Sequence, residues 1–204
     1  HWLTRGSFVN VIPKPETIHD FGGFPQALFD AQYPAPGAPE IAKETAKLSA
    51  LIHEADDWGI DHGAWTILMH LFPKADIPVF QLSIDYYQPM SYHLNLAKEI
   101  RALRERGVLV IGSGNIVHNL RMSMSKLQNQ DTSPFDWAVE FDNWVHEKIK
   151  NRDFQSLTDY EKAGTAGKLS VPTVDHYVPL LYTLGLTDEK EDIRQTYEEV
   201  TFGG

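Results

Sequence analysis

Patterns typical of amphipathic helices alternate along this chain with short runs that are almost wholly apolar. The runs Pro78–Ile84 and Val108–Ile111 have the length and composition of buried strands, and helical patterns lie before, between and after them. This alternation is typical of an α/β fold, in which helices cover both faces of a sheet. We therefore expect one α/β domain with a central mixed sheet over residues 1–204.

Four helices are expected from apolar periodicity and end signals. They are Ile41–Ala55, which follows a proline, Ser91–Gly107, Ser133–Ile149 and Thr173–Gly185. Ser91 and Thr173 are expected to cap their helices, and glycines are expected to end two of them. Residues 10–40 are rich in Pro and Gly and are expected to form a long ordered loop.

The composition excludes several classes of function. Against 28 acidic residues there are 18 Lys and Arg, which gives a formal net charge of -10. That balance argues against a nucleic-acid or anionic-membrane partner, because both need clustered basic residues. No apolar run reaches the roughly 18 residues of a membrane span. Because the chain is acidic and has no cysteine, we expect a cytoplasmic protein.

The chain has no cysteine. Disulfides, zinc–thiolate sites, iron–sulfur clusters and thiol nucleophiles are therefore excluded for these residues. A bound metal would need His, Asp or Glu ligands.

Nine histidines are present, and not all of them need a function. We interpret four of them as structural or solvent-facing, because no other candidate site residues gather in their segments. They are His53, His70, His93 and His146.

Two other histidines lie in turn-rich segments, where the backbone can hold a side chain for use. His19 precedes Asp20, and a hydrogen bond between these two residues is the simplest interpretation. His62 lies between Asp61 and Gly63, where stabilising a turn and contacting a substrate are equally open.

His118 and His176 lie next to different predicted structural elements. His118 comes after the second apolar run and the turn Gly112–Asn115. A Gly-x-Gly turn can cradle phosphate, but the third glycine of the dinucleotide fingerprint is missing. His176 lies in the first turn of an expected helix, where the dipole favours the neutral, metal-binding imidazole. The spacing alone leaves a metal enzyme and a set of structural histidines both open.

The chain resembles the class III extradiol ring-cleavage dioxygenases related to protocatechuate 4,5-dioxygenase, and within them the 4,5-DOPA extradiol subgroup. The matching segments follow one another in the family's order along almost the whole chain. They are His1-Trp2, Thr17–Pro25, Tyr33–Gly37, Trp58–Trp65, Gln81–Ser83, Ser113–Leu120 and Pro172–Tyr182.

The resemblance implies a single α/β domain with a metal pocket at the sheet edge. In this subgroup the metal has three histidine ligands, and two of the ligand motifs match His1 and His176. The third belongs to an N-terminal Gly-His-Gly-Ser-Pro loop without a counterpart here. We therefore expect the chain to lack an N-terminal strand, that ligand loop and its C-terminal end.

The resemblance also assigns roles to the other site residues. His118 matches the acid–base histidine, which takes a catechol proton and later returns it. His62 and Asp61 match an Asp-His-Gly motif whose side chains either support the metal ligands or contact the substrate. Asn115 belongs to the Ser-Gly-Asn motif, and His19 lies in a pocket-lining loop.

The cofactor implied by the resemblance is non-haem Fe(II), and Zn(II) can replace it in purified protein. The implied partners are a small catechol and O2, with no nucleic acid or membrane, and the oligomeric state is open. Two rivals remain: a non-catalytic metal-binding or protein-interaction scaffold on the same fold, and a zinc hydrolase using His1 and His176. No Glu or Asp stands in a general-base motif for the second.

Overall fold

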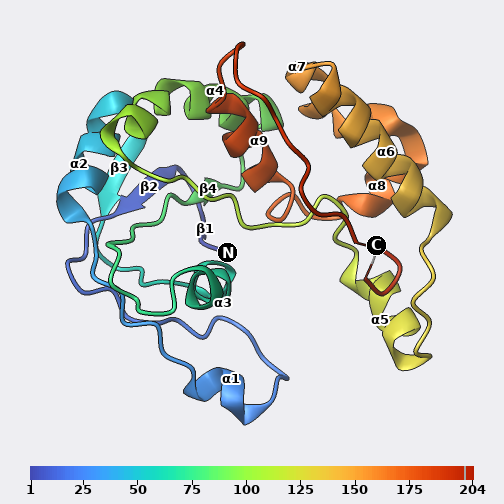
Figure 1. The fold of residues 1–204 in the computed structure, drawn as a ribbon, viewed down its shortest axis with the longest axis horizontal. Coiled ribbons are helices and arrows are strands. Elements are labelled where there is room, and N and C mark those ends of the chain that lie inside the picture. The colour runs from blue at the N-terminus through green and yellow to red at the C-terminus, as the bar shows by residue number, and fades with distance from the viewer. Residues whose placement is uncertain (200) are drawn as a thin grey trace. The chain divides into compact units, whose positions relative to one another are not determined.

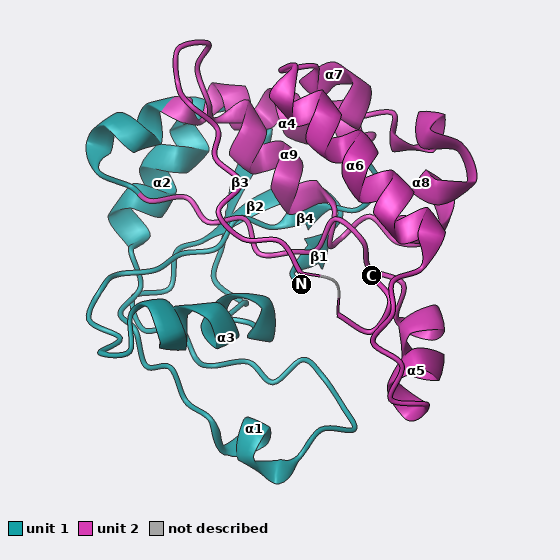
Figure 2. Ribbon diagram, turned by 45° about the vertical axis from the view of Figure 1, so that its right-hand side comes forward, with its two compact units in different colours: residues 1–88, 102–108 teal, residues 89–101, 109–204 magenta. Residues whose placement is uncertain are grey.

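The computed structural model describes residues 1–199 and 201–204. They form two compact units, described separately below (Figure 2). Unit 1 comprises residues 1–88 and 102–108, and unit 2 comprises residues 89–101 and 109–204. The expected mixture of helices and strands is confirmed (Figure 1).

Unit 1 contains all the strands that the described residues form. Its elements are β1 (Leu3–Thr4), β2 (Ser7–Asn10), α1 (Gln26–Asp30), α2 (Pro39–Leu48), β3 (Ile52–Ala55), α3 (His62–Leu71) and β4 (Ile84–Asp85). A 3₁₀ helix, η1 (Arg101–Arg106), runs from the last residue of a unit 2 segment into unit 1.

Unit 2 is helical in its described part. Its elements are α4 (Met90–Glu99), α5 (Leu120–Gln128), α6 (Asp136–Lys150), α7 (Phe154–Leu157), η2 (Tyr160–Ala163), α8 (Gly164–Ser170) and α9 (Val178–Gly185). Within this unit α4 packs against α9 and α6 packs against α8.

The strands pair as two short parallel sheets where one central mixed sheet was expected. Leu3 in β1 pairs with Ile84 in β4, whereas Ser7 in β2 pairs with Ile52 in β3. Between β1 and β2, Gly6 has a φ of +99°, which turns the chain and interrupts the ladder. The partner of the N-terminal segment therefore changes at this glycine.

The two expected strands differ from the structure in length and form. Of Pro78–Ile84, only Ile84 belongs to a strand, and isolated bridges join Gly37 to Val79 and Val9 to Leu82. Val108–Ile111 forms no strand, and Leu109 is 70% exposed. An apolar run forms a strand only if a neighbouring strand pairs with it. None of the described strands pairs with this run.

The four expected helices exist, but their starts are displaced. The first begins at Pro39 and ends at Leu48, and residues 52–55 form β3 instead. Ser91 does not cap its helix, which begins one residue earlier, at Met90.

The last two helices, in contrast, begin later than expected. The helix expected from Ser133 begins at Asp136, and the one expected from Thr173 begins at Val178. Before α9 the chain forms turns in which Tyr177 N and Val178 N both donate to Val174 O. The predicted end of α9 at Gly185 is confirmed.

Each unit has its own buried core. In unit 1, Trp65 is fully buried among Ile60, Tyr33 and Leu68, and its indole N–H donates to Ile18 O over 2.9 Å. In unit 2, Phe141 and other apolar side chains are buried on the helices.

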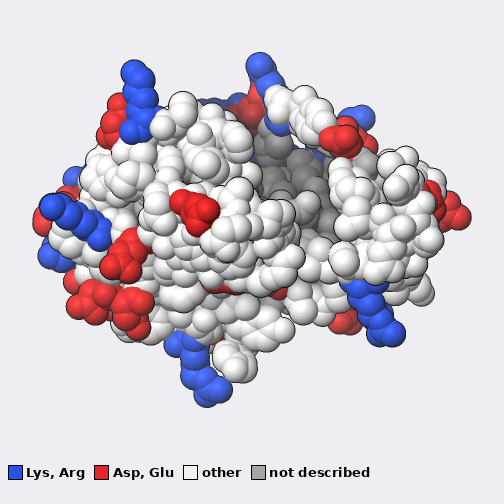
Figure 3. Space-filling view, turned by 90° about the horizontal axis from the view of Figure 1, so that it is seen from below, with Lys and Arg blue, Asp and Glu red and all other residues white. Residues whose placement is uncertain are grey.

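No helix among the described residues has the length and apolar character needed to cross a membrane. On the face drawn in Figure 3, basic and acidic side chains are interspersed, and the basic ones do not gather into a patch.

The interruption between β1 and β2 is held by Ser83, which is fully buried. Its Oγ accepts hydrogen bonds from Phe8 N over 2.8 Å and from Thr4 Oγ1 over 2.7 Å. One hydroxyl therefore satisfies donors on both sides of Gly6.

We predict that Ser83→Ala lowers the free energy of unfolding by about 1–3 kcal/mol, because the partly buried Phe8 N–H loses its acceptor. Denaturant unfolding monitored by circular dichroism measures this. Ser125→Ala on α5 is the matched control, since that side chain is exposed. Equal stabilities of the two variants would contradict the role given to Ser83.

Candidate metal and acid–base site

His1 lies two residues before β1 in unit 1. The next residue, Trp2, is buried, and its ring stacks on Trp58 with 5.7 Å between centroids and 2° between planes. A Cβ atom at Gly63 would lie 3.3 Å from Cδ2 of His1, so the glycine leaves room for the imidazole. The buried tryptophan and this space fix where the His1 ring lies within unit 1.

His62 is the first residue of α3, and Asp20 holds it. Oδ1 of Asp20 accepts from the His62 backbone N–H over 3.0 Å and lies 2.7 Å from its ring Nδ1. Burial raises the pKa of Asp20, but the hydrogen bonds and charge of His62 outweigh it, so this pKa lies below its usual value. Oδ2 of the same carboxylate lies 3.4 Å from the backbone nitrogen of His1.

The expected hydrogen bond between His19 and Asp20 is wrong. His19 Nε2 lies 2.9 Å from Ala31 O, while the neighbouring carboxylate faces His62. Adjacent side chains in an extended segment point to opposite sides, which explains why these two residues have different partners.

Aromatic rings surround these histidines within unit 1. The Phe21 ring is the common neighbour, with centroids 5.9 Å from His19, 5.5 Å from His62 and 6.1 Å from Trp65. Phe24 and Phe29 approach the same ring at 5.5 and 4.9 Å. The loop after residue 18 and the start of α3 therefore form one aromatic cluster.

Asp61 has a structural task in this cluster. It is 1% exposed, and its Oδ1 caps α3 by accepting from Ala64 N over 3.1 Å. Gln81 Oε1 accepts the Asp61 backbone N–H over 2.9 Å. This cap positions His62, the next residue.

In unit 2, the segment 112–119 lies against residues 169–179. Asn115 N donates to His176 O over 3.0 Å, and His118 N donates to Ser170 O over 2.9 Å. The Asn119 amide donates to Leu169 O over 2.8 Å. Hydrogen bonds before and after His118 therefore fix this segment, while the side chain of Asn115 is exposed.

The glycines of the 112–114 turn permit this approach. A Cβ at Gly112 would lie 2.6 Å from Pro179 O, and a Cβ at Gly114 would overlap the carbonyl oxygen of His176. The Gly-x-Gly pattern therefore serves packing against the chain before α9 and its first turn.

The His118 and His176 rings stack face to face, with 3.3 Å between centroids and 12° between planes. Burial lowers the pKa of His118, although the negative charge of Asp175 raises it in part. The net lowering favours a neutral imidazole that can accept a proton near neutral pH.

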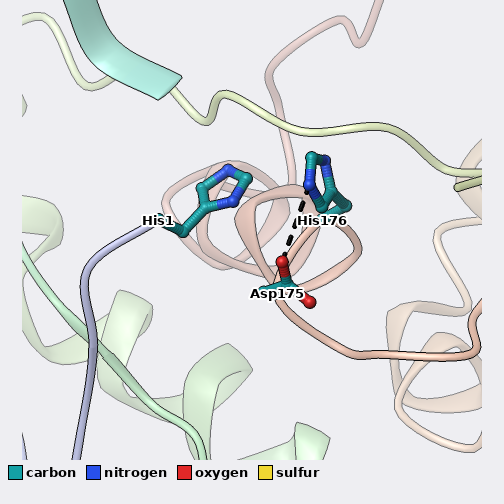
Figure 4. A group of neighbouring side chains, drawn as sticks. All are labelled: His1, Asp175 and His176. Atoms are coloured by element: carbon teal, nitrogen blue, oxygen red, sulfur yellow. Dashed lines mark ion pairs between the residues drawn. The ribbon is translucent and has the colours of Figure 1, made fainter. Parts of the chain in front are cut away.

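Asp175 also faces His176 directly, with Oδ2 at 3.6 Å from Nε2 (Figure 4). Both side chains are largely buried, at 18% and 19% exposure. His1 is drawn in the same figure and belongs to unit 1.

The other four histidines lie outside these arrangements. His53 is on β3 against Phe8, and His70 is near the end of α3. His93 is fully buried on α4 with Nδ1 at 3.3 Å from Tyr182 Oη, and His146 on α6 bonds to Gln195. The helical pattern expected around His53 is wrong, since this residue lies in a strand.

Two acidic residues of the site were missed as partners. Asp20 contacts His62 and Asp175 contacts His176. Asp175 stands next to its histidine in the sequence, which is a usable signal. No spacing rule joins residue 20 to residue 62.

Comparison with known proteins identifies the class. Residues 1–202 match the family described as the catalytic LigB subunit of aromatic ring-opening dioxygenase. The 4,5-DOPA dioxygenase extradiol of Escherichia coli K12 is 42% identical over 212 residues, which cover 100% of this chain and 76% of that protein. The enzyme of the same name from Beta vulgaris is 35% identical over 199 residues, covering 93% and 71%.

A solved structure supports the same conclusion. An uncharacterized protein from Escherichia coli K12 superposes with a TM-score of 0.84 at 36% identity, covering 100% of this chain and 79% of that one. These matches define the chain as a ring-cleaving dioxygenase. It belongs to the LigB family, and the predicted resemblance to class III extradiol enzymes and their 4,5-DOPA subgroup is confirmed.

We predict that Gly114→Ala lowers the free energy of unfolding by about 1–3 kcal/mol, because the added methyl group displaces the His176 carbonyl. Denaturant unfolding measures the loss, and the amide resonances of Asn115 and His176 should shift. Gly22→Ala is the control, since its Cβ would meet no atom within 4 Å. A stability loss no larger than that of the control would contradict the packing role.

Proposed function

We propose that this protein inserts both atoms of O2 into a small catechol and opens the ring beside the two hydroxylated carbons, at a non-haem metal. Fe(II) is the proposed working metal, and Zn(II) is a metal that purified protein can carry. Membership of the LigB family over residues 1–202 is the observation that carries the proposal. The names of the bacterial and plant relatives support a DOPA-like substrate.

In this proposal His1 and His176 are metal ligands. The donor chemistry fits such a metal, because imidazole is the best transition-metal ligand in a chain without cysteine. His176 also has the Asp175 carboxylate beside it, and carboxylates of this kind orient metal-binding histidines. When bound, Fe(II) supplies binding positions for both catechol oxygens and for O2.

His118 is the proposed acid–base residue. Burial favours its neutral form, so the ring can accept a proton from a catechol hydroxyl and return it as the ring opens. The bond from its backbone to Ser170 O and the stacking on His176 restrict its rotation. Fixed orientation of this kind lowers the entropy lost in proton transfer.

The aromatic cluster of unit 1 supports a flat substrate. We assign substrate contacts to His19 and His62, whose rings border Phe21. Asn115 offers an exposed amide, and Asp61 acts through the helix start that it caps.

We predict that His118→Ala lowers turnover by about 10²–10⁴-fold while metal content stays unchanged, because only proton transfer is lost. His176→Ala should lose metal and activity together. Oxygen uptake and metal analysis on the same samples measure both quantities. His146→Ala, an exposed residue on α6, is the control. Loss of metal from His118→Ala would make that residue a ligand and overturn its assigned role.

We also predict that the Fe(II)-loaded protein consumes one O2 per catechol and forms a ring-opened product that absorbs in the near-ultraviolet to visible range. Catechols with a carboxylated side chain, such as DOPA or caffeate, should react faster than catechol itself. If every catechol is inert while metal is fully bound, the scaffold hypothesis replaces the dioxygenase hypothesis.

A further inference from the structure

The carboxylate of Asp20 determines which ring nitrogen of His62 carries a proton. Oδ1 lies 2.7 Å from Nδ1 and also accepts the backbone N–H of the same residue over 3.0 Å. An ionised carboxylate can only accept hydrogen bonds, so Nδ1 must be the donor. The neutral His62 ring therefore has its proton on Nδ1 and a lone pair on Nε2.

His19, the residue before Asp20, has its other ring nitrogen hydrogen-bonded. Its Nε2 lies 2.9 Å from the carbonyl oxygen of Ala31, which also can only accept. Neutral His19 therefore carries its proton on Nε2. Two histidines that contact the same Phe21 ring are thus held in different tautomers by different acceptors.

The surroundings of His62 limit its movement but leave it accessible. The Phe21 ring meets it edge to face at 80°, with 5.5 Å between centroids. The Asp20 side chain is 18% exposed and that of His62 is 35% exposed. The His1 ring lies at 6.3 Å between centroids. An incoming molecule can therefore reach the His62 ring close to a proposed metal ligand.

We propose that Asp20 is a positioning residue that holds His62 with Nδ1 protonated and thereby presents Nε2 as a hydrogen-bond acceptor to a hydroxyl group of the substrate. Naming a catechol hydroxyl as the donor rests on the proposed function. The tautomer itself does not depend on that function.

The chemical consequence is a matched pair of donor and acceptor. A catechol hydroxyl is a donor, and an Nε2 lone pair accepts it. If the proton were on Nε2, the ring would direct an N–H donor toward the substrate. The O–H of the catechol would then have no acceptor on this ring. A positioned acceptor also contributes more than a rotating one, because less rotational freedom is lost on binding.

The test is the tautomer of His62, read from long-range 1H–15N NMR spectra of protein labelled in histidine, at a pH where the ring is neutral. We expect Nδ1–H for His62 and Nε2–H for His19 in the wild-type protein. In Asp20→Ala, His62 should shift to mainly Nε2–H, the form favoured by free histidine in water, while His19 stays unchanged. Asp57→Ala removes an exposed carboxylate of the same unit and should change neither ring.

A second variant covers the case in which Asp20→Ala does not fold. Asp20→Asn keeps an acceptor oxygen but removes the charge, and a neutral acceptor is about half as strong. The Nδ1–H population of His62 should then fall. An Nε2–H ring in the wild-type protein, or an unchanged His62 tautomer in the folded Asp20 variants, overturns the proposal.

Kinetics separate this inference from the proposed function. In the metal-loaded protein, Asp20→Ala should lower kcat/KM for a catechol by about 10–100-fold, whereas Asp57→Ala should not. A changed tautomer with unchanged kcat/KM overturns the role in substrate binding. If the wild-type protein is also inert to every catechol, the dioxygenase proposal fails while the tautomer result still decides the action of Asp20.

Discussion

The approach of the Gly112–Gly114 turn to the chain before α9 is the contact on which the histidines of unit 2 depend. Without side chains at both glycines, Asn115 N reaches the carbonyl oxygen of His176. That bond, together with the one from His118 N to Ser170 O, holds the two rings face to face. Because neither bond uses an imidazole nitrogen, backbone atoms fix the rings and leave their chemistry available.

In unit 1 the position of a histidine ring is fixed by acidic side chains. Asp61 caps α3, and Asp20 accepts both the first N–H of that helix and the ring of His62. Negative charge is stabilising at a helix N-terminus, where backbone N–H groups are unsatisfied. The unsatisfied N–H groups at the start of α3 therefore explain why the carboxylates of Asp20 and Asp61 lie there. These two carboxylates and the aromatic cluster together hold His62.

The acidic composition of the chain has a local counterpart at these histidines. The carboxylate of Asp20 contacts the ring of His62, and that of Asp175 contacts the ring of His176, each within its own unit. A carboxylate beside an imidazole fixes the orientation and tautomer of the ring, which general acid–base chemistry and metal binding both require. The fold alone would not assign this chemistry, and the family match supplies the reaction class.

The sequence by itself determined the mixture of helices and strands and the family, because local patterns and ordered motifs are readable along the chain. It failed at Val108–Ile111 and in predicting one central mixed sheet, because pairing depends on which strand lies alongside. It also gave Asp20 the wrong partner. Only the tertiary structure decided that Asp20 faces His62 and that Gly114 meets His176, because contacts between residues 42 and 62 positions apart depend on chain packing and have no signature in local spacing.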